Sequence, residues 1–238
     1  YLLALAIGIP ASGAMADRFG ARRVFSASIV VFVAGSVLCS LATSVPTMVA
    51  ARLLQGAGGS MMAPLGRLIL LRTVERRHLV SAMSWTLVPA FLGPLLGPPL
   101  GGLLVTHASW HWIFYINVPI GILGFVLVRA VIPYIEAADE PRPFDLPGFV
   151  LCGLCLGCGL FGLESVGQPG NLVTGLALMA VSASAAAGYL WHARRAAAPL
   201  LDLDVLKIDS FRLSVIGGSL MRITQGAQPF LLPLMMQV

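Results

Sequence analysis

Two arginines at membrane depth are the residues of this chain best suited to chemistry. Arg52 and Arg222 fall inside apolar stretches, where an ionisable side chain costs about 2.5–3.5 kcal/mol to insert. Arg52 lies about one and a half helical turns below the loop at Pro46, and Arg222 lies about 20 Å along its own helix. Arg67 is different, because it is only about 7.5 Å from Arg72 along a helix and its side chain can extend to the membrane surface. Arg52 and Arg222 are therefore the functional candidates.

A second concentration of charge lies in the sequence GAMADRFGARR, residues 13–23. Only 11% of the chain is charged, yet four charges fall within seven positions here, at Asp17, Arg18, Arg22 and Arg23. The sequences on both sides are uncharged over lengths that approach or exceed those needed to cross a bilayer. We therefore predict a polar loop between two membrane spans.

The composition of the chain indicates an all-α integral membrane protein. Of its 238 residues 58% are hydrophobic, against about 45–50% in an ordinary soluble domain. The alternating pattern of a membrane β-barrel is absent, so helices are the spanning elements. The net charge of +5 comes from basic residues dispersed among apolar segments, which excludes a continuous nucleic-acid-binding face.

Eight apolar segments supply the elements that must position these charges. The intervening loops fall into two alternating classes: the first, third, fifth and seventh contain or adjoin twelve of the fifteen basic residues, and the others contain none. By the positive-inside rule the basic loops are cytoplasmic, so the first segment runs inwards and we expect at least one more helix before it. We also expect the last segment to continue beyond this sequence. The predicted segments are 1–16, 24–43, 47–71, 79–105, 112–133, 147–166, 172–191 and 211–238.

The charged loop resembles the signature loop between helices two and three of the major facilitator superfamily. An ordinary positive-inside turn would account for its arginines but not for an acid and two glycines at fixed offsets. Gly20 permits the positive φ that a tight reversal needs. The residues that fit the pattern G-x-x-x-D-R-x-G-x-R-R are Gly13, Asp17, Arg18, Gly20, Arg22 and Arg23.

The sequence ARLLQGAGGS resembles the R-x-x-Q-G-x-G motif in the fourth helix of the same superfamily. Arg52 and Gln55 are three residues apart and share a helix face, and Gly56 follows one turn after Arg52. Small residues here let a neighbouring helix come close. The resemblance implies a part in proton coupling for Arg52. The alternative is a structural arginine, satisfied by carbonyls or by Gln55 in a helix interface.

A third match lies in the sequence LGPLLGPPLGG. Gly93, Gly97 and Gly101 recur every four residues and form one stripe without side chains, in a span that also holds several prolines. We expect this helix to be kinked and tightly packed. Gly97, Pro98, Gly101 and Gly102 match the core of the antiporter motif of helix five; generic packing by small residues is the alternative.

Further matches extend the resemblance along the chain to the fourteen-span drug:proton antiporter family. SWHWIFYINVPIG, RPFDLPGF and PLLDLDVLKIDSFRLS resemble the openings of its helices six, seven and nine. Two departures, His111 for the usual Arg and Leu146 for the usual Trp, affect the subgroup rather than the family. The segments then correspond to helices two to nine, in three parts: 1–133, an N-terminal bundle lacking its first helix; 134–209, two linker helices; and 210–238, the start of a C-terminal bundle.

Two other groups of residues could suggest metal chemistry. His107 and His111 are four residues apart but have no third ligand nearby, so packing in the interfacial belt of Trp110 and Trp112 is the better interpretation. The C-x-x-C-x-x-C pattern at residues 152–158 spreads over about 120° of a helix and lacks a fourth cysteine. We predict small packing residues, with no metal and no cofactor.

These features predict a transporter of the cell membrane, with the bacterial inner membrane as its location. We expect it to exchange protons for amphiphilic compounds by alternating access, and whether a periplasmic adaptor joins it is left open. Proton coupling usually needs a carboxylate within a span, and Glu164 is the only acid that we predict in or near one. The resemblance places the coupling carboxylate in the family's first helix, which we expect to precede this sequence. A narrow-substrate exporter and a non-transporting scaffold are alternatives; a membrane enzyme would need a catalytic cluster, and none is visible. Arg222, with Gln225 three residues later, is the remaining intramembrane polar candidate.

Overall fold

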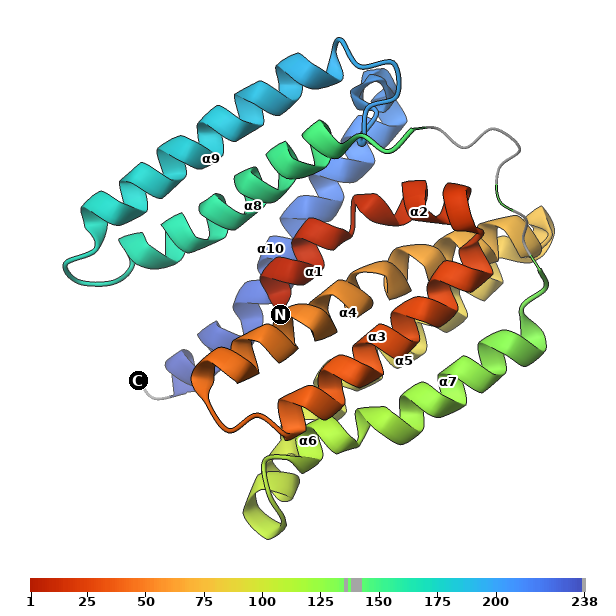
Figure 1. The fold of residues 1–238 in the computed structure, drawn as a ribbon, viewed down its shortest axis with the longest axis vertical. Helices are drawn as coiled ribbons and strands as arrows, with labels where there is room; N and C mark the ends of the chain where they lie inside the picture. The colour runs from red at the N-terminus through yellow and green to blue at the C-terminus, as the bar shows by residue number, and fades with distance from the viewer. Residues whose placement is uncertain (135–136, 138–142, 237–238) are drawn as a thin grey trace. The chain divides into compact units, whose positions relative to one another are not determined.

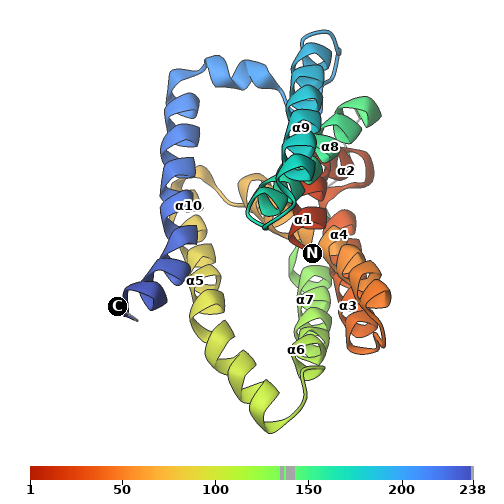
Figure 2. The same cartoon turned by 90° about the vertical axis from the view of Figure 1, so that its left-hand side faces the viewer.

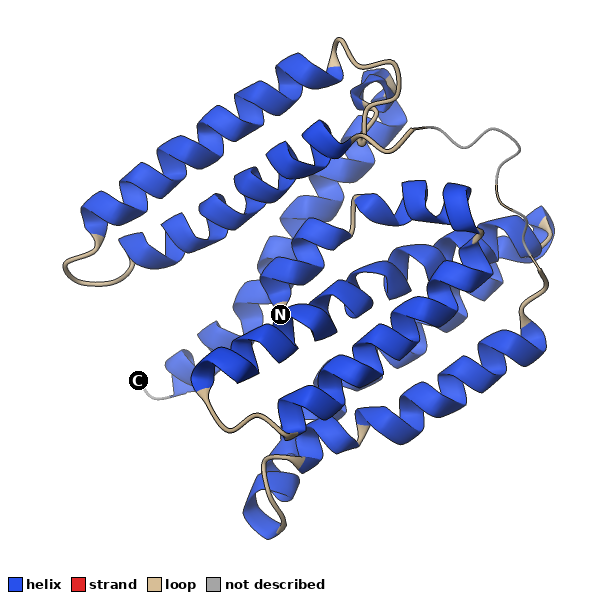
Figure 3. Ribbon diagram, viewed as in Figure 1, coloured by secondary structure: helices blue, strands red, loops and turns tan. Residues whose placement is uncertain are grey.

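The computed structural model describes residues 1–134, 137 and 143–236. In these ranges the regular elements are all helices, and no strand occurs (Figure 3). The chain divides into two compact units, Tyr1–Leu200 and Leu201–Val238, which are treated separately below. The all-helical fold class predicted from the sequence is confirmed.

The first unit begins with a broken span. Helix α1 (Leu2–Gly8) and helix α2 (Ala11–Phe19) meet at an angle of 57°. The span predicted for residues 1–16 corresponds to this bent pair, and the sequence analysis did not foresee the bend. Pro10 lies at the break and has no N–H with which to continue the helical hydrogen bonds.

Helix α3 (Ala21–Ser40) and helix α4 (Val45–Thr73) form an antiparallel pair (Figure 1). Ser44 caps the start of α4: its hydroxyl accepts from the backbone N–H of Thr47, whose own hydroxyl accepts from the Ser44 N–H. Such a capping box satisfies two of the free donors at a helix start and defines where α4 begins. Small buried residues, among them Ser36 and Ala51, line the pair and allow close packing.

A long helix and a broken one follow. Helix α5 (Arg76–His107) continues through its prolines as one element and presents exposed apolar side chains. Helix α6 (Trp112–Tyr115) and helix α7 (Asn117–Val131) together make the next span, and α7 packs against α3 (Figure 1). Most large apolar side chains of the chain are exposed, as expected where lipid rather than protein covers them.

Helix α8 (Leu146–Val166) and helix α9 (Leu172–Ala193) form a hairpin and lie side by side in both views (Figures 1 and 2). Their backbones approach closely where Gly162 faces Gly175: a Cβ on Gly175 would lie 3.0 Å from the carbonyl oxygen of Gly162. The second unit holds the 3₁₀ helix η1 (Leu203–Lys207) and helix α10 (Asp209–Met236).

Five of the described helices are long and apolar enough to cross a membrane, or six if the bent α1–α2 pair counts as one span. Each of the eight predicted segments corresponds to a helix or helix pair, although α4 and α10 are not among those five. Helix α4 carries Arg52, Arg67 and Arg72, which lower its hydropathy. Multiple apolar helices identify a multi-pass membrane protein. The three-part division predicted from the sequence stays a prediction.

Candidate functional site

The signature loop forms a tight reversal between α2 and α3. Gly20 has φ = 84°, in the left-handed region that disfavours side chains, so the glycine predicted for this turn is confirmed. Its N–H donates to the carbonyl of Ala16 at 2.8 Å, and its own carbonyl accepts from Val24 at the start of α3. The turn therefore closes one helix and opens the next without a gap in hydrogen bonding.

Asp17 has a partner within this chain. Nη2 of Arg72, at the end of α4, lies 3.0 Å from Oδ1 of Asp17, and about 40% of each side chain is exposed. From the family resemblance we also expect Asp17 to contact a second half of the protein when the cytoplasmic side is closed, and that contact stays a prediction; within this unit Asp17 pairs with Arg72. An exposed pair of this kind contributes about 0–1 kcal/mol, so its effect on stability is small.

Two of the loop's arginines reach α7 or the residues just after it, and Arg18 contacts its own neighbour. Arg22 donates from Nη2 to the carbonyl of Arg129 near the end of α7, while its Nε is buried without a partner among the described residues. The guanidinium of Arg23 lies 5.2 Å from the ring centroid of Tyr134, and that of Arg18 lies 5.6 Å from Phe19. The loop thus connects the ends of α2, α3, α4 and α7, which is more than an ordinary turn requires.

Arg52 is held on two sides. Its Nη1 donates to Oε1 of Gln55 at 3.1 Å, as the three-residue spacing predicts. Its guanidinium lies 4.6 Å from the ring centroid of Phe114, within the range of a cation–π interaction. Phe114 is only 4% exposed, so this contact is largely shielded from solvent.

A buried hydrogen-bond chain continues from Gln55. Nε2 of Gln55 donates to the hydroxyl oxygen of Ser36 on α3 at 2.7 Å, and Nδ2 of Asn117 on α7 donates to the same oxygen at 3.4 Å. The Ser36 hydroxyl in turn donates to the carbonyl of Phe32. Ser36 is fully buried and Gln55 is 2% exposed, so these groups have no solvent with which to replace a lost partner.

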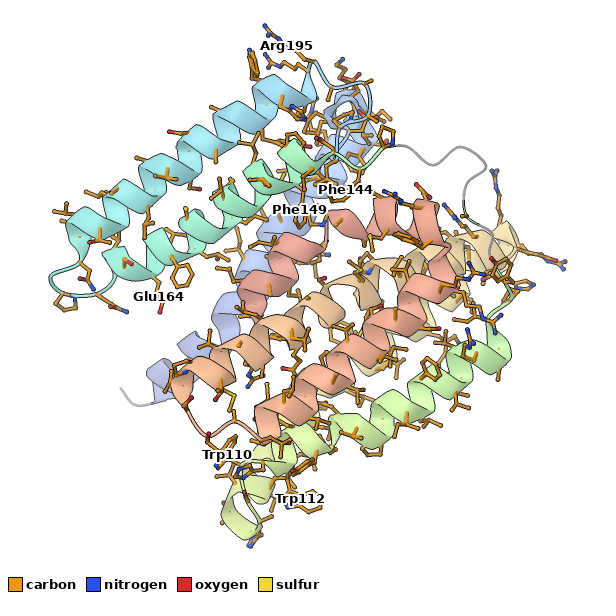
Figure 4. The ribbon with its side chains drawn as sticks, in the orientation of Figure 1. Trp110, Trp112, Phe144, Phe149, Glu164 and Arg195 are labelled. Atoms are coloured by element: carbon orange, nitrogen blue, oxygen red, sulfur yellow. The ribbon has the colours of Figure 1, made fainter. Side chains whose placement is uncertain are left out.

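Arg52 also lines a cavity of about 620 Å³ in the first unit. Glu164, near the end of α8, lines the same cavity; Figure 4 shows its side chain on the side of α8 away from α9. The cavity therefore brings together a fixed cation and the one acid that the sequence places in or near a span. The other residues that line it are Tyr1, Leu2, Leu3, Leu160 and Phe161.

The glycines beside Arg52 are sites of close helix approach. A Cβ on Gly56 would lie 2.6 Å from the backbone oxygen of Tyr1 on one side of α4, and a Cβ on Gly58 would lie 2.4 Å from the backbone nitrogen of Phe32. Backbone atoms cannot move aside as a flexible side chain can. The expectation that small residues here admit neighbouring helices is confirmed.

The glycine stripe of α5 differs from its prediction. No described atom lies within 4 Å of the position that a Cβ would take on Gly93, Gly97, Gly101 or Gly102. The tight packing expected here is therefore not seen among the described residues of the first unit. Pro98 lies within the continuous helix.

The remaining candidates give no local site. Arg222 is exposed on α10 within the second unit, and the side chain of Gln225 lies outside the described part of the chain. No described atom lies within 4 Å of the position that a Cβ on Gly13 would take, and Gly13 lines a cavity of about 190 Å³ together with Asp17 and Asp145. Arg142, a predicted cytoplasmic charge, also lies outside the described residues. At the other membrane face, the ring of His111 stacks on Trp110 with centroids 3.8 Å apart, as the interfacial-belt interpretation predicts.

Asp145 joins the hairpin to the segment that follows it. Its carboxylate accepts from the backbone N–H of Gly148 at the start of α8, from Nε2 of His192 on α9 at 2.7 Å, and from the N–H of Leu200 at 3.0 Å. Burial raises the pKa of Asp145, but these hydrogen bonds outweigh it and hold the pKa below its usual value. The carboxylate therefore stays charged at neutral pH.

Several of these partners were missed by the sequence analysis. Ser36 and Phe114 carry no signal in one sequence, because buried serines and aromatics are common in helices. Asn117 and Asp145 stood inside matched motifs without an assigned role, and Arg72 was counted only as a loop charge. A polar residue such as Asn117 at the start of a span was the one available signal.

Comparison with known proteins identifies the same family for nearly the whole chain. The family model described as Major Facilitator Superfamily matches residues 1–236. Relatives named "Putative multidrug resistance protein MdtD" from Salmonella paratyphi A and Salmonella typhimurium are each 42% identical over 241 residues. The relative of that name from Serratia proteamaculans is 40% identical over 241 residues. In each case the match covers 100% of this chain and 50% of the relative, so the chain spans half the length of these relatives.

Proposed function

Because this chain belongs to the Major Facilitator Superfamily, a family of membrane transporters, we propose that the whole protein is a secondary transporter that exports amphiphilic compounds in exchange for protons. Its similarity to proteins named for multidrug resistance supports export of such compounds. The proposal includes alternating access, in which two halves expose a central site to each side of the membrane in turn. We place the protein in the inner membrane of a bacterium.

One observation carries the coupling part of this proposal. Arg52, a charge in a helix of the bundle, is fixed by Gln55 and Phe114 and lines the same cavity as Glu164. An arginine keeps its positive charge in proteins. It therefore lowers the pKa of any carboxyl group that comes near it. When the carboxyl group moves away, its pKa rises again and it can take up a proton. A conformational change that moves a carboxyl group, whether that of Glu164 or one in the preceding helix, toward or away from Arg52 would couple proton release to transport.

The test is Arg52→Ala in the full-length protein. Gln55 keeps its hydrogen bond to Ser36 in this variant, so the protein should fold and its abundance in the membrane should stay near wild type. We expect proton-dependent efflux of ethidium to fall at least about tenfold, which corresponds to about 1.4 kcal/mol of lost coupling. Efflux is followed by fluorescence in inverted vesicles with an imposed pH gradient.

Arg67→Ala is the matched control, because Arg67 is an exposed arginine on the same helix. Its loss should leave efflux near wild type. If Arg52→Ala lowers abundance in parallel with efflux, Arg52 is a structural residue. If both variants export normally, the coupling role proposed for Arg52 is wrong.

The orientation has its own test. A cysteine introduced at Val45 or Gln168 should react with an impermeant thiol reagent added outside intact cells, whereas one at Arg77 or Ala197 should not. Val45 and Gln168 lie in or directly beside the predicted loops without basic residues, which the positive-inside rule places outside. Labelling of the second pair alone would invert the orientation.

A further inference from the structure

We propose that the junction between α6 and α7 positions Arg52, by the ring of Phe114 directly and by Asn117 through Ser36 and Gln55. This inference rests on the proposed coupling role of Arg52 and extends it to residues of a different span. Both junction residues lie in the sequence WIFYIN, Phe114 near the end of α6 and Asn117 at the start of α7, three positions apart. Phe114 contacts Arg52 at one end of the hydrogen-bond chain, and Asn117 contacts Ser36 at the other.

The direct contact is the stronger one. With 4.6 Å between the guanidinium carbon and the ring centroid, Arg52 sits over the negative face of Phe114. Phe114 is itself fixed, because it is buried with Cys39 and Ala51 and meets the ring of Trp110 edge-on at 6.1 Å. A movement of this ring would therefore remove a stabilising partner from the charge.

The indirect contact acts on the other side of the guanidinium. Gln55 uses its carbonyl oxygen to accept from Arg52 and its amide nitrogen to donate to Ser36, so the two bonds require one orientation of its amide group. Asn117 donates to the same Ser36 oxygen at 3.4 Å, which makes it the longest and weakest of the hydrogen bonds that link Arg52, Gln55, Ser36 and Asn117. Asn117 thus helps to hold Ser36, and through it the amide that holds Arg52.

This arrangement means that a movement of the α6–α7 span would change the contacts of the Arg52 guanidinium. Helix α7 carries Asn117, and α6 precedes it by a single residue, Ile116. Because Arg52 and Gln55 both belong to α4, displacement of the α6–α7 span would take the ring of Phe114 away from the guanidinium and remove the Asn117 donor from Ser36, while the Arg52–Gln55 bond could persist with one support fewer. Phe114 and Asn117 are positioning residues in this scheme, and Arg52 is the group that would meet the titrating acid.

The main experiment replaces the ring with a somewhat smaller apolar side chain. Phe114→Leu in the full-length protein should lower the maximal rate of proton-dependent ethidium efflux about fivefold or more, with unchanged KM for ethidium and unchanged abundance. Phe114→Tyr keeps the aromatic face and should restore the rate. Tyr115→Leu is the matched control, because Tyr115 follows directly and its described ring contact is to Trp112 rather than to Arg52.

Asn117 is tested by one substitution that removes its donor, one that keeps it, and a double-mutant cycle. Asn117→Leu should lower the maximal rate in the same way but less, and Asn117→Gln, which keeps a donor, should retain more of it. In a Gln55→Leu background Asn117→Leu should have no further effect, since the chain is already broken. Ser36→Ala should reproduce the loss, whereas Ser28→Ala, a buried serine on the same helix bonded only to its own helix, should not.

Distinct outcomes separate this inference from the proposed function. Multiplicative losses in the Asn117 and Gln55 cycle, or an equal loss in Tyr115→Leu, would overturn the positioning role. Thermal unfolding of the Arg52→Ala and Phe114→Leu single and double variants reports their contact independently of transport. Non-additive unfolding temperatures with normal efflux in every variant would refute the coupling function while the contact stands; additive temperatures would refute the inference itself.

Discussion

Helices α4 and α5 are both rich in glycine, but among the described residues neighbouring backbone comes close to Gly56 and Gly58 of α4 and to none of the stripe glycines of α5. A Cβ on Gly58 would meet the backbone of α3 at 2.4 Å, and one on Gly56 would meet the backbone at Tyr1 at 2.6 Å. On α5, Gly93, Gly97 and Gly101 form a regular stripe with open space before them. The same residue type therefore marks a completed contact in one helix and an uncovered face in the other.

This difference shows what a glycine pattern can and cannot report. A small residue makes close approach of another backbone possible, and it costs a helix about 0.5–1 kcal/mol relative to alanine. Whether another helix uses that space depends on the neighbours that the fold supplies. The predictions below test that comparison and extend it to contacts made by charge.

The largest expected effect is at Gly58. Gly58→Ala places a methyl group against backbone atoms of α3 that cannot yield, so we expect a loss of about 1–3 kcal/mol of stability. Gly66→Ala on the same helix is the control: nothing lies within 4 Å of its Cβ position, and it should stabilise by about 0.5–1 kcal/mol. Thermal unfolding in detergent measures both, and equal shifts for the two variants would contradict the packing described here.

The hairpin of α8 and α9 is joined to the following segment by charge as well as by small residues. Asp145→Asn keeps the shape of the side chain but loses its charge-assisted hydrogen bonds to His192 and Leu200, and should cost about 1–2 kcal/mol at pH 7. Because the pKa of Asp145 is lowered in the folded protein, this contribution is complete above about pH 4, the ordinary range of an aspartate.

The contribution of Asp145 should then disappear as the pH falls through the lowered pKa, where the folded carboxylate takes up its proton. Unfolding temperatures of wild type and Asp145→Asn, measured from pH 7 downwards, should therefore converge in acid. Asp202→Asn is the control, since Asp202 is an exposed cap that asparagine can replace. A constant difference at every pH would show that the charge of Asp145 is not what holds the segment.

At the open stripe the sign of the effect reverses. Gly97→Ala should stabilise the full-length protein by up to about 1 kcal/mol, because the methyl group meets nothing and the helix gains propensity. The measurement is again thermal unfolding. A loss as large as that of Gly58→Ala would show that another element covers the stripe in the whole protein, and would remove the contrast between α4 and α5.

The smallest effect on stability is expected at Asp17. About 40% of Asp17 and Arg72 is exposed, so Asp17→Asn should change the free energy of unfolding by less than about 0.5 kcal/mol. We nevertheless expect slower efflux and greater thiol accessibility on the cytoplasmic side, because a small bias in free energy is enough to shift two conformational states. Glu75→Gln, which breaks a more exposed pair with Arg77, is the control. Unchanged accessibility and efflux would leave Asp17 with a topological role alone.

Much of the local structure could be predicted from short-range patterns. The positive φ of Gly20 follows from glycine at a tight reversal, and the Arg52–Gln55 contact follows from a three-residue spacing on a helix. The bend at Pro10 also has a local cause, but the predicted segment ran through it, because apolar length alone does not register a break in the helix. Each of these features depends on neighbours within a turn or two.

The rest depends on residues far apart in the chain. Asp17 and Arg72 are 55 positions apart, and Asn117 and Ser36 are 81 apart; no periodicity relates such pairs. Polar residues on helices that pack together find partners according to how the helices are rotated and at what depth they cross. One sequence contains the donors and acceptors but not those rotations.

By itself the sequence determined that this is a helical membrane protein, where its helices lie, and which charges stand at their ends or within them. The physical reason is local: a backbone in lipid must satisfy its own hydrogen bonds, so length and hydropathy alone define a span. The tertiary structure decided that Arg52 is held between Gln55 and Phe114, that Asp17 pairs with Arg72, and that no other described residue lies against the glycine stripe of α5. Those outcomes depend on packing between spans, because a contact forms only where two helices pack with the two side chains facing each other at the same depth.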